Sequence, residues 1–212
     1  MSDRAKGVTV NSWIRREFRS AGLTQYPVGP YLGAIQQQFG GVVLLCIDVS
    51  GSMCGAPLTS AVRGARQFAK EAIDAYYEVG VILWHHSIAA TIEPTRDLPS
   101  VLRFLDAPVD SGGTDINDAL DAAHDLLRPR GTRLDRVVAI FGDGDLGDRS
   151  RAVAKAAVMR AEDIRIITVG LGDAAAHALD EISTESNERP RTATPSTIDT
   201  EIAGVASGLR RR

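Results

Sequence analysis

Four short apolar segments, rich in Val, Ile and Leu, alternate along this chain with stretches of helical pattern. They are GVVLLCI at 41–47, EVGVILWHHSIAATI at 78–92, RVVAIF at 136–141 and IRIITVGLG at 164–172. Each is apolar on both faces and bounded by glycines and charges, which is typical of parallel strands covered by helices on each side. In the second segment, SIAATIE follows VGVILWHH with almost no gap. This spacing predicts a hairpin, and hence one antiparallel strand at the sheet edge.

Candidate helices fill the intervals, at 57–77, 114–128, 148–162 and 196–212. Pro57, Thr114 and Ser196 are residue types that favour helix starts. The second helix is expected to stop before Pro129. The alternation of strands and helices predicts an α/β fold. We expect a Rossmann-like, doubly wound, mostly parallel sheet with one antiparallel edge strand and helices on both faces.

The size of the chain sets its domain organisation. Its 212 residues suffice for one hydrophobic core and are few for two domains. The alternating pattern fills residues 40–212, which we expect to form the domain. Residues 1–39 include the turn-rich YPVGPYLG and are predicted to be an N-terminal strap or docking arm.

Net charge, hydropathy and cysteine count indicate which partners, location and thiol state to expect. The formal net charge is −3, and no tract interleaves aromatic with basic residues, so we expect no nucleic-acid partner. The first residues, MSDRAKGVTVNSW, lack the apolar region of a signal peptide, and no run approaches a membrane span. We therefore expect no membrane partner and a cytoplasmic location. Cys46 and Cys54 are too few for a disulfide scaffold and are expected to be reduced thiols.

Oxygen-bearing side chains gather where the predicted strands end. The first strand is followed by Asp48, Ser50 and Ser52, in an extended exit where alternate side chains point the same way. Ligands of open α/β sheets bind beyond the carboxyl ends of the strands, where such loops converge. The loops around SGGTD and FGDGD bring further candidates to that edge: Thr114, Asp115, Asp143 and Asp145.

This donor set predicts a cation site. Carboxylate and hydroxyl oxygens are hard ligands that suit Mg²⁺, with Mn²⁺ or Ca²⁺ as substitutes. Neighbouring carboxylates repel each other, and a divalent cation removes that cost. A histidine ligand is a minority interpretation, since His85 and His86 would point to opposite faces of a strand. His124 and His177 lie on helical stretches and are expected at the surface.

A metal-dependent enzyme is the alternative that these residues leave open. A Mg²⁺-dependent hydrolase or phosphatase would use Asp48 or a metal-bound water. The phosphatase pattern places a second Asp two positions later, where this chain has Ser50. A serine nucleophile elbow would need glycine where Asp48 stands. No general base or phosphate-binding lysine is found at the expected loop ends, so we expect no enzymatic activity.

The motifs DVSGS at 48–52, SGGT at 111–114 and FGDGD at 141–145 resemble the von Willebrand factor type A (VWA) domain with its metal-ion-dependent adhesion site (MIDAS). The resemblance covers roughly residues 40–209. The usual third motif reads T-D-G, and here Gly142 replaces the threonine. The resemblance implies that five residues form the metal site: Asp48, Ser50, Ser52, Thr114 and Asp143.

The resemblance also implies roles for these residues and a function. Ser50, Ser52 and Thr114 would coordinate the metal directly or through water, and the two aspartates would often act through water. An acidic residue of a partner protein would take the remaining coordination position. The implied function is a protein-binding module, an adaptor or regulatory subunit of a bacterial, intracellular type. Its partner would be a protein supplying an Asp or Glu, such as an ATPase or a stress or defence component.

Overall fold

The computed structural model describes residues 40–107, 112–185 and 189–209. The strands are β1 Gly41–Asp48, β2 Glu78–Trp84, β3 Ile88–Thr95, β4 Asp135–Gly142, β5 Ile164–Leu171 and β6 Thr192–Ala193. The helices are α2 Ala56–Asp74, α3 Leu98–Leu105, α4 Asn117–Leu127, α5 Arg149–Ala161, α6 Asp173–Asp180 and α7 Ile198–Gly208, with a short 3₁₀ turn η1 at Gly51–Met53. The predicted strap at 1–39 lies outside the described residues.

The described strands form one sheet in the order β3-β2-β1-β4-β5-β6. β1 pairs in parallel with both β2 and β4, and β5 pairs in parallel with β4 and β6. β3 pairs antiparallel to β2 through the hairpin that the sequence predicts. Starting from β1, the chain adds β2 and β3 on one side of the sheet and then β4, β5 and β6 on the other side. The carboxyl ends of β1 and β4 are therefore the switch point of the sheet.

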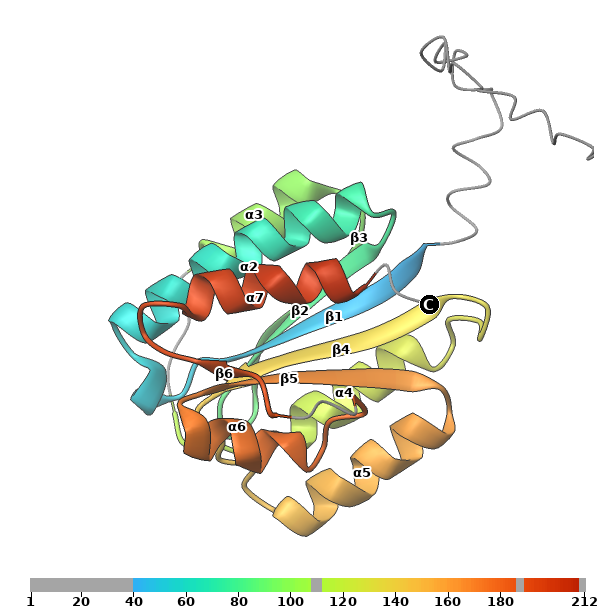
Figure 1. The fold of residues 1–212 in the computed structure, drawn as a ribbon. Helices are drawn as coiled ribbons and strands as arrows, with labels where there is room; N and C mark the ends of the chain where they lie inside the picture. The colour runs from blue at the N-terminus through green and yellow to red at the C-terminus, as the bar shows by residue number, and fades with distance from the viewer. Residues whose placement is uncertain (1–39, 108–111, 186–188, 210–212) are drawn as a thin grey trace, which may run out of the picture.

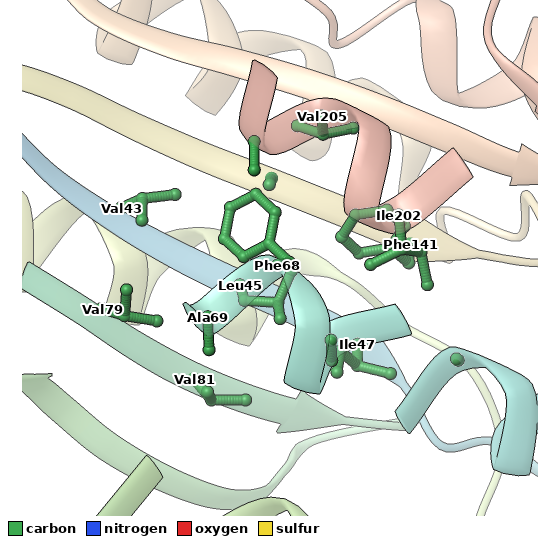
Figure 2. Close-up of a cluster of buried hydrophobic side chains, with 14 of the residues drawn as sticks. Val43, Leu45, Ile47, Phe68, Ala69, Val79, Val81, Phe141, Ile202 and Val205 are labelled. Carbon is green, nitrogen blue, oxygen red and sulfur yellow. The ribbon is translucent and has the colours of Figure 1, made fainter. Parts of the chain in front are cut away.

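Helices cover both faces of this sheet, α2, α3 and α7 on one side and α4, α5 and α6 on the other (Figure 1). β1 serves both cores, because alternate side chains of a strand point to opposite faces. Val43, Leu45 and Ile47 pack under the first layer, where Phe68 of α2 also lies (Figure 2). Val42, Leu44 and Cys46 face the second layer. The predicted fold class is confirmed.

Some predicted boundaries were wrong. α4 begins at Asn117 and not at Thr114: Ile116 is its N-cap residue, and the preceding turn is held by the Asn117 backbone N–H, which donates to the Asp115 carboxylate (2.9 Å). α7 begins at Ile198 rather than at Ser196. Three short elements, α3, α6 and β6, were not predicted.

The histidines also differ from expectation. His124 is buried, 7% exposed, and its Nε2 lies 2.9 Å from the Glu162 carboxylate. His85 and His86 do not point to opposite faces, because the hairpin turn after β2 stacks their rings with centroids 4.4 Å apart. Both cysteines are free thiols. Among the described helices, none is long and apolar enough to cross a bilayer.

Candidate metal site at the carboxyl edge of the sheet

Three loops meet at the carboxyl edge of β1 and β4. The first runs from Val49 to Gly55 after β1, the second covers 112–116 before α4, and the third covers 143–148 after β4. The Gly51 backbone N–H donates to the Gly112 carbonyl (3.1 Å), which ties the first loop to the second. The Val49 N–H donates to the Trp84 carbonyl (2.8 Å) and holds the start of the first loop against β2.

Asp48 lies fully buried at the centre of this edge. Its carboxylate accepts hydrogen bonds from the Ser50 N–H (2.8 Å) and the Asp143 N–H (3.4 Å), so one side chain organises the exits of β1 and β4. Burial raises the pKa of Asp48 above 3.8, hydrogen bonds from Ser50 oppose the rise, and the charge of Asp143 adds to it. A positive charge at this edge would offset the repulsion between the two carboxylates.

Hydroxyl and carboxylate oxygens converge beside Asp48. The Ser50 and Ser52 hydroxyl oxygens lie 3.0 Å apart, but the predicted extended exit is wrong, because Ser52 lies in the 3₁₀ turn η1 and that turn brings the two hydroxyls together. The Ser52 hydroxyl donates a hydrogen bond to the Asp143 carboxylate. The structure thus brings Asp48, Ser50, Ser52 and Asp143 together in one hydrogen-bonded group from two loops.

Thr114 lies in the second loop, between two residues whose backbone groups tie that loop to this edge. It is half-buried, and within the described residues no side-chain hydrogen bond connects it to the other four. Its loop is held by the Gly51 to Gly112 hydrogen bond and by the Asp115 N–H, which donates to the His85 carbonyl (2.9 Å).

The two further candidate aspartates serve as turn caps. The Asp115 carboxylate accepts from the backbone and the side chain of Asn117. The Asp145 carboxylate accepts from the Gly147 N–H (2.9 Å) and is exposed. Asn117 was not singled out in the sequence, because an Asn near a helix start looks like an ordinary cap.

Gly142 explains a departure from the expected third motif. A Cβ built on Gly142 would lie 3.2 Å from Asp48 Oδ2, 3.3 Å from Asp48 Cβ and 3.4 Å from the Trp84 ring. These distances are tighter than ordinary van der Waals contacts, so the buried Asp48 and Trp84 leave little space for a threonine. Glycine here permits the close approach of β4 to Asp48.

The chemistry of the donor set fits a hard divalent cation. It combines two carboxylates with serine and threonine hydroxyls, the oxygen ligands that Mg²⁺ accepts. Across the described residues, no group of three or more His, Cys, Asp or Glu side chains forms a cation site. Any site at this edge must therefore rely on the hydroxyl oxygens of Ser50, Ser52 and Thr114.

Comparisons with known proteins bear on the fold. Residues 43–145 match the family model of the von Willebrand factor type A domain. Sequence comparison with curated proteins gives no significant match. The vWF domain of the type V pili tip protein Mfa5 from Porphyromonas gingivalis has a TM-score of 0.70 at 15% identity, over 82% of this chain and 97% of that one.

Two further solved structures show the same fold. BatB from Bacteroides thetaiotaomicron has a TM-score of 0.60 at 19% identity, over 79% of this chain and 100% of that one. The pilus adhesin SpaC from Lactobacillus rhamnosus GG has a TM-score of 0.69 at 11% identity, over 81% of this chain and 30% of SpaC. The chain thus spans less than a third of SpaC.

The sheet order defines a doubly wound α/β domain in which three loops converge at the carboxyl ends of β1 and β4. More particularly, the described part of the chain has the fold of these solved structures, and its residues 43–145 match the von Willebrand factor type A family model.

Proposed function

We propose that this chain is a divalent-cation-dependent protein-binding module, an adaptor or regulatory subunit that captures an acidic residue of a partner protein. Asp48, Ser50, Ser52, Thr114 and Asp143 would hold the cation, which is Mg²⁺, with Mn²⁺ or Ca²⁺ as substitutes. The bound cation would supply positive charge that attracts the partner's Asp or Glu carboxylate.

The hydrogen bond from Ser52 to Asp143 carries this proposal. It brings a hydroxyl from the exit of β1 to a carboxylate from the exit of β4, with Ser50 and Asp48 beside them. Four of the five residues implied by the family resemblance thereby share one small volume. Asp48 is buried where only a counter-charge or hydrogen bonds can support its ionised form.

The surroundings of this group support binding over catalysis. In the described part of the chain, no His, Lys or Arg side chain hydrogen-bonds to Asp48, Ser50, Ser52 or Asp143. A hydrolase at this edge would have to use the Asp48 or Asp143 carboxylate as its proton-transferring group, and in the proposed function both carboxylates hold the cation instead. An adaptor has no such requirement, because an open carboxylate-binding position is sufficient.

The class of partner follows from the chemistry of the site. A carboxylate presented by a protein surface suits the site, and the named activities of SpaC, a pilus adhesin, and Mfa5, a pili tip protein, support a role in protein contacts. We place this chain in the cytoplasm of a bacterial cell, acting beside an ATPase or a component of a stress or defence system.

Calorimetric titration of chelator-treated protein with MgCl₂, MnCl₂ and CaCl₂ tests the proposal. Wild type should bind one cation, and a Ser50→Ala, Ser52→Ala double variant should lose binding. Ser60→Ala is the matched control, because Ser60 is a buried serine on α2 outside the three loops. Wild type that binds none of the three cations overturns the proposal.

Affinity capture then tests the partner class. Proteins that wild type retains in Mg²⁺, and that are lost both with chelator and with the double variant, are the ligands. Their binding should fall when the contacting Asp or Glu is replaced by Asn or Gln. Retention that is equal in the presence of chelator would contradict cation-dependent capture.

A further inference from the structure

The second and third loops are joined by one buried amide. Asn117, the first residue of α4, is 2% exposed. Its Nδ2 donates to the Asp115 carboxylate (2.7 Å) in the second loop, and to the Asp148 carbonyl (3.1 Å) and the Leu146 carbonyl (3.5 Å) in the third. One side chain therefore bridges the loop that carries Thr114 and the loop that begins at Asp143.

An independent packing contact lies at the same junction. Gly147 has a φ of +62°, and a Cβ built on it would lie 2.6 Å from the Asp115 Cγ and 2.9 Å from its Cα. The third loop can therefore approach the second this closely only with glycine at 147. The hydrogen bonds of the Asn117 amide and the absence of a Cβ at Gly147 both set the distance between the second and third loops.

We infer that Asn117 is a positioning residue of the cation site: by fixing the spacing between the second and third loops, it makes the site prefer the small Mg²⁺ over the larger Ca²⁺. This inference rests on the proposed function. Asn117 would not contact the cation itself. It acts through the backbone of the two loops that carry Thr114 and Asp143.

The preference follows from the different demands of the two ions. Mg²⁺ requires nearly ideal octahedral geometry with oxygen ligands about 2.0–2.1 Å away, whereas Ca²⁺ tolerates flexible sets at about 2.3–2.6 Å. Loops that are free to separate can still satisfy Ca²⁺ but no longer hold oxygens at the distance that Mg²⁺ needs. Loss of the Asn117 side-chain hydrogen bonds should therefore weaken Mg²⁺ binding more than Ca²⁺ binding.

Asn117→Ala removes the bridge and keeps the turn before α4, because the backbone N–H of residue 117 still donates to Asp115. We expect its Mg²⁺ dissociation constant to rise about tenfold, as for outer ligand partners in other metal sites, with a smaller rise for Ca²⁺. His124→Ala is the matched control, since it removes a buried polar side chain from the same helix. It should lower the melting temperature and leave the Mg²⁺ to Ca²⁺ affinity ratio unchanged.

Gly147→Ala tests the same spacing by a second route. Its new methyl group must push the loops apart, so the affinity ratio should shift toward Ca²⁺ as in Asn117→Ala. Gly172→Ala is its control, because Gly172 also has a positive φ (+88°) but a Cβ there meets no atom within 4 Å. Gly172→Ala therefore introduces backbone strain at a positive φ without pushing any neighbouring loop away.

The outcomes distinguish the positioning role of Asn117 from the proposed function. Calorimetric titration of the wild type and the four variants with MgCl₂ and with CaCl₂ gives the affinity ratios. If wild type binds cations and both test variants keep its ratio, the positioning role of Asn117 is wrong and the proposed function stands. If wild type binds neither cation, the proposed function and this inference both fail.

Discussion

Ser52 donates a hydrogen bond to the carboxylate of Asp143, although 91 positions separate the two residues in the sequence. Asp143 in turn donates its backbone N–H to Asp48, the last residue of β1. This pair of contacts joins the carboxyl ends of two neighbouring strands. It places two negative charges close together in a partly buried setting, which shapes how the protein should respond to charge removal and to cations.

Asp143→Asn should abolish the stabilisation that Mg²⁺ gives to the wild type. A cation present at 100 times its dissociation constant stabilises a folded protein by about 2.7 kcal/mol. In chelator, the variant should be at least as stable as wild type, because the charge beside Asp48 is gone. Thermal unfolding with MgCl₂ and with EDTA measures both effects.

Asp145→Asn is the control for this comparison, since Asp145 is exposed and caps its own turn. It should keep the full response to Mg²⁺. A response of Asp143→Asn equal to that of wild type would remove Asp143 from the site.

Gly64→Ala should destabilise the protein, although alanine is normally the better helix residue. A Cβ at Gly64 of α2 would lie 2.7 Å from the Asp199 Cα and 2.8 Å from its carbonyl oxygen, so α7 must move away. Overpacking of this kind costs about 1–3 kcal/mol. Urea unfolding measures the loss, and Gly131→Ala, where a Cβ meets no atom within 4 Å, should change stability by less than about 1 kcal/mol.

Only Cys54 should react with N-ethylmaleimide in the native protein. Cys54 is exposed, whereas Cys46 is buried in β1 and burial raises its pKa to about 12. Mass spectrometry should show one label before unfolding and two after it. Cys54→Ser should take up no label while folded, and rapid native labelling of that variant would show that Cys46 is accessible.

The ion pairs between α4 and α5 should add stability that depends on pH. Lys155 and Arg151 lie 2.5 and 2.6 Å from the Asp121 carboxylate, and the Lys155 hydrogen bond is the main cause that lowers the pKa of Asp121 below 3.8. The unfolded chain therefore binds this proton more readily. The contribution is present above pH 3.8 and is lost as the pH falls through the lower pKa of the folded state.

Lys155→Met should reduce this dependence. Because the pair is partly exposed, the change should stay below about 1 kcal/mol. Urea unfolding at neutral pH and at acid pH measures it, with Lys70→Met, an exposed lysine on α2, as the control. An unchanged acid dependence in Lys155→Met would show that this pair adds nothing.

The fold was predictable because its main strands have continuous apolar centres, at 42–47 in β1 and 137–141 in β4. β1 and β4 are buried on both faces, so their sequences carry an unambiguous signal of a parallel sheet. The shorter elements carry little signal. α6 has eight residues, half of them alanine, and β6 has only the two residues Thr192 and Ala193, which form a strand because they pair with β5.

The convergence of four candidate residues was predictable for a similar reason. Asp48, Ser50 and Ser52 are close in sequence, and parallel strands bring their carboxyl ends to one edge. What the sequence could not indicate is set by tertiary contacts. The burial of His124 depends on the position of Glu162, and the bridging role of Asn117 depends on carbonyls some thirty residues further on.

The joining of distant loops also bears on the synthesis of the protein. A nascent chain that ends at Ser52 contains the Ser50 and Ser52 hydroxyls but lacks Asp143, which accepts the Ser52 hydrogen bond and follows 91 positions later. A ribosome-bound fragment that ends before β4 thus has no pocket for an ion. For the proposed cation site, uptake of the ion would mark the moment at which the nascent polypeptide has paired β4 with β1, before β5 and β6 are added.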